Sequence, residues 1–190
     1  MTTYTLRTYT ADDENSWLRC RVLSFLSTPY FDAVERTKPA IAAPGPELVV
    51  VDGDDHVVGI MDTGIEGGLA TIDTVAIHPD HQRRGLGTRL LQETRARVRA
   101  AGADVLDAWT RDHEPTLAWY RSVGFAESDH YLHVYADLYT DPAEPQRAVV
   151  TAGADLRPVR AFLHAPLAQE ERLRGEFARV HVCRRFSMTA

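Results

Sequence analysis

The spacing of apolar residues predicts a strand followed by a helix at the start of the chain. Residues 4–10 alternate between apolar and polar positions, as in a half-buried strand. Thr10, with Asp13 three residues later, is typical of a helix N-cap, so a helix is predicted from there to about Leu26. Residues 27–46 contain four prolines and are predicted to form a loop.

The middle of the chain alternates between strand and helix patterns. Two β-branched runs, residues 47–52 and 56–63, are joined through Gly53-Asp54-Asp55 and predict a hairpin. After this antiparallel start, strands alternate with helices, which indicates an α/β fold with a mixed sheet. The predicted order is strand 70–77, helix 84–101, strand 104–110 and helix 114–123.

The last third of the chain is predicted to contain a strand pair interrupted by a long excursion. Residues 125–138 alternate, with Leu132 and Val134 on one side and His133 on the other. Residues 140–178 are rich in Pro, Ala and Glu and are long for a connection, although a helix is predicted near 167–177. Residues 179–186 are predicted to be the last strand. We therefore expect one domain over residues 1–190, with 140–178 as an excursion before its last strand.

The segment Gln82-Arg83-Arg84-Gly85-Leu86-Gly87-Thr88, called the 82–88 turn below, carries the main chemical signal. It lies where the 70–77 strand gives way to a helix. The first amides of a helix lack internal partners and lie at the positive end of the helix dipole. Gly85 and Gly87 let an anion approach the backbone, and Arg83 and Arg84 add two charges. The pattern suits a pyrophosphate.

Two other phosphate motifs are absent from this segment. No Gly-Lys-Ser/Thr follows it, which excludes a P-loop, and Leu90 occupies the position of the third glycine of a dinucleotide fingerprint. By itself, the turn is also compatible with an ordinary strand-to-helix connection that has a basic surface.

Composition narrows the class of protein. Hydrophobic residues make up 44% and charged residues 25% of the chain, as in soluble globular proteins. The net charge of −6 argues against a nucleic-acid partner. Cys20 and Cys183 show no metal-ligand spacing, and no signal peptide or long apolar run is visible, so we expect a cytoplasmic protein without a bound metal or a membrane partner. Lys38 is the only lysine, which leaves little room for Schiff-base chemistry.

A second motif lies downstream and completes a resemblance. Residues 117–125, LAWYRSVGF, form a predicted helix that ends in Gly-Phe, with Tyr120 four residues before Gly124. Together with V-A-I-H-P-D-H-Q-R-R-G-L-G over residues 75–87, this resembles the GNAT superfamily of acetyl-CoA-dependent N-acyltransferases. The resemblance covers Tyr4 to about Tyr139. It implies a mixed, mostly antiparallel sheet with flanking helices, and acetyl-CoA as cosubstrate.

The resemblance also implies roles for individual residues. The backbone of Val75 and Ile77 would hydrogen-bond the pantetheine arm like an added strand. Tyr120 matches the tyrosine that faces the cofactor sulfur and acts as general acid. His113 stands where an asparagine is common in the family, seven residues before Tyr120. The cosubstrate phosphates would be held at Gln82, Arg83, Arg84, Gly85, Leu86, Gly87 and Thr88.

The general base and the acceptor site are less defined by the sequence. Asp73 lies on the 70–77 strand, in alternation with Val75 and Ile77, and is a candidate base; a structural role is equally compatible with its position. His133 and Asp107 are weaker candidates. Four residues of the proline-rich loop could line an acceptor pocket: Tyr30, Phe31, Asp32 and Glu35.

The function expected from the resemblance is transfer of an acetyl group to a primary amine of a small molecule or protein, by direct attack in a ternary complex. The alternative is a CoA-binding sensor or scaffold with a degenerate acceptor site. A nucleotide or sugar-phosphate binder is disfavoured by the missing P-loop lysine and third glycine. The sequence leaves a homodimer open.

Overall fold

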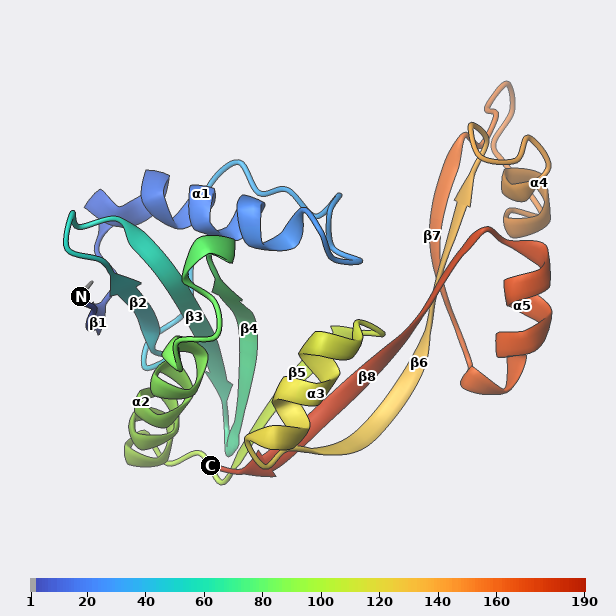
Figure 1. The fold of residues 1–190 in the computed structure, drawn as a ribbon. Helices are drawn as coiled ribbons and strands as arrows, with labels where there is room; N and C mark the ends of the chain where they lie inside the picture. The colour runs from blue at the N-terminus through green and yellow to red at the C-terminus, as the bar shows by residue number, and fades with distance from the viewer. Residues whose placement is uncertain (1–2) are drawn as a thin grey trace. The chain divides into compact units, whose positions relative to one another are not determined.

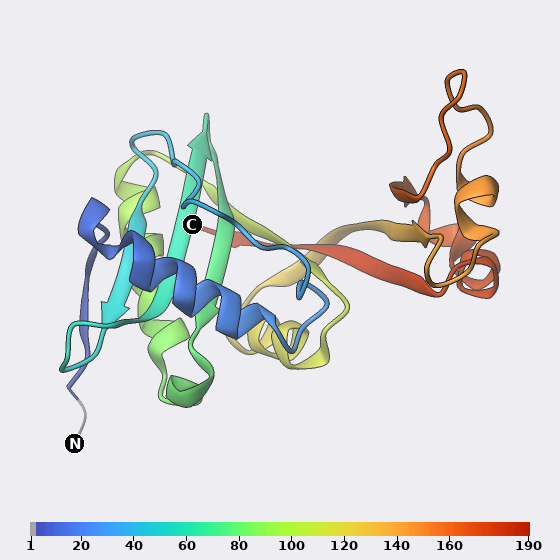
Figure 2. The ribbon, with the colours of Figure 1, turned by 90° about the horizontal axis from the view of Figure 1, so that it is seen from above.

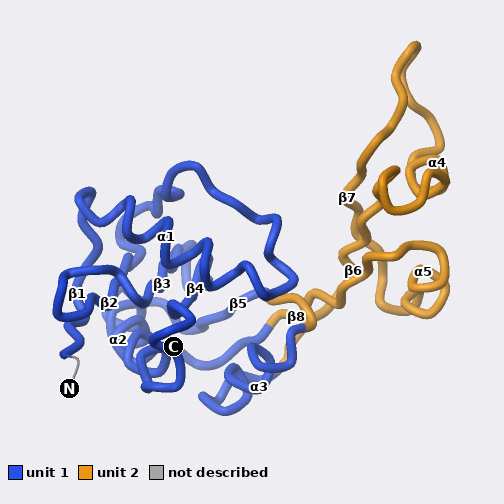
Figure 3. The backbone as a smooth tube through the Cα atoms, turned by 45° about the horizontal axis from the view of Figure 1, so that its top comes forward, with its two compact units in different colours: residues 1–109, 113–126, 186–190 blue, residues 110–112, 127–185 orange. Residues whose placement is uncertain are grey.

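The computed structural model describes residues 3–190, which divide into two compact units (Figure 3). Unit 1 holds the described residues up to Trp109, then 113–126 and 186–190. Unit 2 holds 110–112 and 127–185. The strands form an eight-stranded sheet in the order β1-β2-β3-β4-β5-β8-β6-β7. Three of these strands, β5, β6 and β8, run from one unit into the other along the chain.

Unit 1 contains the antiparallel run of the sheet and its parallel pair (Figure 1). The neighbouring strands β1 and β2, β2 and β3, and β3 and β4 are antiparallel, whereas β4 and β5 are parallel. This confirms the mixed, mostly antiparallel sheet expected from the sequence. The bounds are β1 Thr5–Thr8, β2 Glu47–Val51, β3 Val57–Glu66, β4 Leu69–Ile77 and β5 Val105–Arg111.

Helices cover both faces of this sheet (Figure 2). After Glu47, every residue of β2 is apolar because the strand packs on both sides. Leu48 and Val50 belong to the cluster with α2, whereas Val49 and Val51 belong to the cluster with α1. On α1, Trp17 and Cys20 are fully buried. The helices are α1 Glu14–Phe25, α2 Leu86–Ala100 and α3 Glu114–Ser122, all three at the predicted places.

Unit 2 has its own apolar cluster on one side of β6 (Ala126–Asp137). Leu132 and Val134 pack there with Leu173 and Phe177, as the alternation of this strand predicts. The cluster includes α5 (Glu170–Glu176), the helix expected near 167–177, and Val180 and Val182 of β8 (Arg179–Thr189). The sequence predicts this last strand over residues 179–186, and it extends three residues further, to Thr189.

The 140–178 excursion contains more regular structure than the sequence suggests. It includes α4 (Glu144–Ala148) and a strand, β7 (Arg160–Ala165), that pairs antiparallel with β6. The strand escapes prediction because Ala161 and Ala165 make its inward side weakly apolar. Glu144 is 2% exposed, and its carboxylate accepts hydrogen bonds from the amides of Asp137 (2.9 Å) and Ala178 (2.6 Å).

Short 3-10 turns complete the chain at Ala11–Asp13, Pro79–His81 and Leu167–Gln169. The first contains the predicted cap, since the amide of Thr10 donates to Asp13 Oδ2 over 2.8 Å. Across residues 3–190, every helix is too short or too polar to pass through a lipid bilayer.

Candidate functional site

The strand β4 loses its neighbour on one side halfway along its length. Pairing with β5 runs from Leu69 opposite Val105 to Ile72 opposite Ala108, and it ends there. Pairing with β3 continues to Ile77. The amide of His78 donates to the Val58 carbonyl on the β3 side (2.9 Å), so alternation turns the backbone groups of Val75 and Ile77 toward the open side. An extended ligand could add there as a strand would.

A β-bulge in the β3–β4 pair lies where β4 separates from β5. Asp62 pairs with Thr74 and Thr63 with Ile72, which leaves Asp73 as the extra residue of β4. The sequence predicts Asp73 on the same side of β4 as Val75 and Ile77 because the three residues alternate. The bulge interrupts this alternation. Asp73 is exposed, and its Oδ2 accepts a hydrogen bond from the Thr74 hydroxyl over 3.1 Å.

The 82–88 turn has the backbone shape of an anion site. Arg83 and Gly85 both have left-handed backbones, with φ of 58° and 75°, and Gly85 caps α2. The amide of Gln82 donates to the Pro79 carbonyl (3.4 Å), and the next amide with an acceptor is that of Arg89, which donates to the Gly85 carbonyl (3.0 Å). Within residues 3–190, the amides of residues 83–88 have no acceptor. They therefore remain available to an anionic ligand.

The side chains of the turn are not equivalent. The Arg84 guanidinium donates to the Tyr4 hydroxyl (2.8 Å) and to the Asp80 carbonyl (3.1 Å), so it is already held by the protein. Gln82 donates to the Ile77 carbonyl over 3.2 Å. The Arg83 side chain is exposed, and among the described residues it has no partner. Of the two predicted charges, Arg83 is the one available to a ligand.

Tyr120 lies on α3 in an aromatic environment. Its ring stacks on Phe186 (5.3 Å between centroids) and packs edge-on against Phe125 (5.2 Å) and Trp119 (4.9 Å). The residue is 2% exposed, and burial raises the pKa of its phenol well above the usual value. In the part of the chain that the structure describes, its hydroxyl has ring neighbours but no hydrogen-bond partner. It therefore stays protonated and can donate.

The other candidates have structural partners. Asp107 is 1% exposed and accepts a hydrogen bond from the Thr71 hydroxyl (2.6 Å). His113 precedes α3, and its Nδ1 is 2.8 Å from the Thr116 hydroxyl. His133 lies in unit 2, where burial lowers its pKa to about 4 and Arg111 donates to it over 3.2 Å. At neutral pH its ring is uncharged.

The loop between α1 and β2 is held by a residue that sequence reasoning did not assign to it. Lys38 forms ion pairs with Glu47 and with Asp62 (3.5 Å), and its side chain is 3% exposed. The Nζ atom also lies 4.6 Å from the centre of the Tyr9 ring. The only sequence feature that could have indicated this role is that Lys38, the single lysine, lies in the proline-rich segment. Of the loop residues proposed for an acceptor pocket, Glu35 pairs with Arg21 of α1 (3.7 Å).

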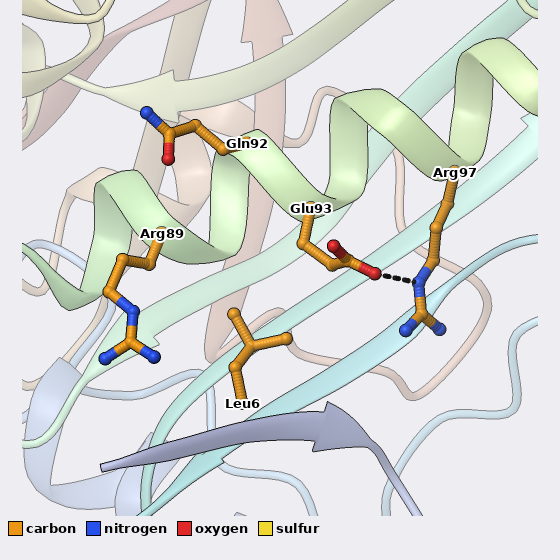
Figure 4. Close-up of a pocket in the computed structure, with 5 residues that line it drawn as sticks. All are labelled: Leu6, Arg89, Gln92, Glu93 and Arg97. Atoms are coloured by element: carbon orange, nitrogen blue, oxygen red, sulfur yellow. Dashed lines mark hydrogen bonds and ion pairs between the residues drawn. The ribbon is translucent and has the colours of Figure 1, made fainter. Parts of the chain in front are cut away.

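A surface hollow of about 430 Å³ lies between β1 and α2 (Figure 4). Glu93 and Arg97 point toward one another in it and form an ion pair of 2.8 Å. None of the predicted site residues is among those that line it: Leu6, Arg89, Gln92, Glu93 and Arg97.

Potential metal ligands gather in the β2–β3 turn. Ligand atoms of Asp52, Asp54 and His56 lie within 4.8 Å of one another. Asp52 Oδ1 accepts hydrogen bonds from the amides of Asp54 and His56, both over 3.0 Å. This arrangement is that of a side-chain-capped hairpin turn.

Comparison with known proteins agrees with the geometry. Residues 44–127 match the family model described as acetyltransferase (GNAT) domain. Over this segment, the chain carries a GNAT acetyltransferase domain. Mycothiol acetyltransferase from Clavibacter michiganensis subsp. michiganensis is 31% identical over 130 residues, which cover 65% of this chain. The chain spans 42% of the length of that relative.

Solved GNAT structures share the fold. A GNAT family acetyltransferase from Elizabethkingia anophelis with acetyl-CoA bound superposes with a TM-score of 0.56 at 13% identity, and 98% of each chain is covered. PaiA N-acetyltransferase from Thermoplasma acidophilum in complex with coenzyme A gives the same score and identity, over 67% of this chain and 92% of that one. At 13% identity, the likeness to these two structures shows the fold alone.

Proposed function

We propose that this GNAT chain transfers the acetyl group of acetyl-CoA to a primary amine of a small molecule or a protein, within a ternary complex. The observation that carries the proposal is the run of amides over residues 83–88 that lack acceptors, next to the open side of β4. A diphosphate bound by these amides would place a pantetheine arm beside Val75 and Ile77. Arg83 would add its charge, while Arg84 would hold the turn against Tyr4, the residue before β1.

Tyr120 is the proposed general acid. When an amine attacks the thioester directly, the leaving group is a thiolate whose conjugate acid has a pKa of about 8.5. A proton donor next to the sulfur favours its departure. The Tyr120 phenol is suited to this because burial keeps it protonated and no described residue accepts its proton.

Asp73 is the proposed general base, acting directly or through water. A lysine-like amine with a pKa of about 10.4 must lose its proton, at a cost of about 4.6 kcal/mol at pH 7. For an α-amine of pKa near 7.7, the same step costs about 1 kcal/mol, so a base matters much less. The exposed Asp73 carboxylate lies at the bulge where β4 parts from β5, with Arg21 of α1 within electrostatic range.

The runner-up is a CoA-binding sensor or scaffold without catalysis. It shares the phosphate site but does not require a protonated phenol. Burial of Tyr120 without an acceptor for its hydroxyl favours the enzyme, because such a donor has no evident purpose in a scaffold.

The experiment that separates these functions measures thiol release from acetyl-CoA with a panel of amines. The panel should contain small-molecule amines, including the acceptor of the mycothiol acetyltransferase relative, and peptides with free N-termini. Amine-dependent release above the hydrolysis background supports the enzyme. Tight CoA binding without release from any acceptor supports the sensor, and absence of CoA binding contradicts both.

A further inference from the structure

Trp119 connects the 82–88 turn to Tyr120. A Cβ placed on Gly87 would lie 3.5 Å from three indole atoms of Trp119, including Nε1. The indole ring also packs edge-on against Tyr120, with 4.9 Å between centroids. The same side chain therefore contacts the helix start proposed to hold phosphate and the phenol proposed to protonate sulfur. The motif over residues 117–125 by itself predicts no role for this residue.

The indole N–H lies over the first turn of α2. In a helix, the Cα–Cβ direction tilts toward the N-terminus. Gly87 is the second residue of α2, so the Nε1 edge lies near the amides of Leu86, Gly87 and Thr88, which lack acceptors. Within residues 3–190, the half-buried Trp119 indole also has no hydrogen-bond acceptor. An indole N–H can only donate, so it adds one more donor to this group.

We propose that Trp119 is a further cosubstrate-binding residue, whose indole N–H donates a hydrogen bond to a diphosphate oxygen of acetyl-CoA. The inference rests on the proposed function, because it requires the diphosphate to occupy the 82–88 turn. It explains why an indole, and not a smaller ring, packs against a glycine there. A bound diphosphate would fix the indole in one orientation, and the indole would in turn fix the ring of Tyr120.

The test compares Trp119→Phe with the parent protein on two acetyl donors. Phenylalanine keeps an aromatic ring beside Tyr120 but removes the N–H. Acetyl-pantetheine has the same thioester as acetyl-CoA and no diphosphate. Loss of a hydrogen bond to a charged oxygen should lower kcat/KM for acetyl-CoA about tenfold or more. The kcat/KM for acetyl-pantetheine should change less than threefold, whereas a general packing defect would lower both.

A matched control is Trp17→Phe, which removes another indole N–H from the same unit. Trp17 donates to Asp62 over 3.0 Å in the cluster under α1 and does not contact the 82–88 turn. We expect Trp17→Phe to lower stability while CoA affinity, measured on folded protein, stays within about threefold. Equal loss of CoA affinity in both variants would overturn the proposal.

Nuclear magnetic resonance provides a readout that does not depend on turnover. The chain has three tryptophans and so three indole N–H signals, of which the Trp119→Phe variant identifies one. Added inorganic pyrophosphate should move the Trp119 signal downfield, together with the amides of residues 85–88. If the amides move and the indole does not, the Trp119 inference fails and the proposed function stands. If neither pyrophosphate nor CoA moves the amides, the proposed function itself fails.

Discussion

Burial keeps the Tyr120 phenol protonated across the physiological pH range, so its ionisation should be invisible in a pH–rate profile below about pH 10. The cause is desolvation by the surrounding Phe125, Phe186 and Trp119 rings, which disfavours the phenolate. Any change of rate with pH below about pH 10 would then arise from ionisation of the acceptor amine or of another group.

Tyr120→Phe should lower kcat about tenfold to a hundredfold, since general acids contribute at least that much in other enzymes. CoA affinity should change little, and the melting temperature should stay nearly constant because the ring contacts remain. Thiol-release assays measure kcat, titration calorimetry measures CoA affinity, and scanning calorimetry measures the melting temperature. An unchanged kcat with a good acceptor would remove the general-acid role.

Gly85→Ala should destabilise the protein by about 1–2 kcal/mol, because a left-handed backbone is costly for residues with a Cβ. The effect is one of backbone conformation alone, since nothing lies within 4 Å of an added Cβ. Asparagine tolerates this conformation better, so Gly85→Asn should cost less. Urea denaturation measures the difference. Equal losses for both variants would contradict a conformational cause.

At the scale of elements, the sequence predicts those segments whose contacts repeat with strand or helix spacing. The helix α2 is predicted because Leu86, Leu90 and Leu91 face one cluster, and β2 because both its sides are apolar. The bulge at Asp73, the tie between Arg84 and Tyr4 and the burial of Lys38 depend on residues distant in sequence. Periodicity contains no information on such contacts, so they could not be predicted.

The α1–β2 loop should depend on Lys38 more than on any periodic feature of its sequence. Lys38→Met leaves Glu47 and Asp62 without their cation, and breaking a buried pair typically costs about 3–5 kcal/mol. Adding Asp62→Asn should recover part of this loss, because without Lys38 the buried Asp62 carboxyl has to bind a proton to avoid an unpaired charge. Denaturant unfolding of the single and double variants checks both statements. A single variant as stable as the parent would show that the pair does not anchor the loop.

At the scale of the whole molecule, Asp62 should give stability a characteristic pH dependence. Burial raises its pKa to about 7, above the unfolded value of about 3.9. The folded state then retains a proton that the unfolded chain has released. The contribution of Asp62 is therefore fully present below about pH 4 and is lost as the pH rises through 7. Relative to the parent, Asp62→Asn should gain stability steadily from pH 4 to 7; a constant difference would contradict the raised pKa.

The central claim concerns the amides at the start of α2, and calorimetric titration with CoA tests it most directly. Gly87→Glu places bulk and negative charge beside these amides, whereas Gln92→Glu adds the same charge to the exposed face of the same helix. We expect the parent and Gln92→Glu to bind one CoA per chain with similar affinity, and Gly87→Glu to bind none. A Gly87→Glu protein that binds CoA as the parent does would contradict the account.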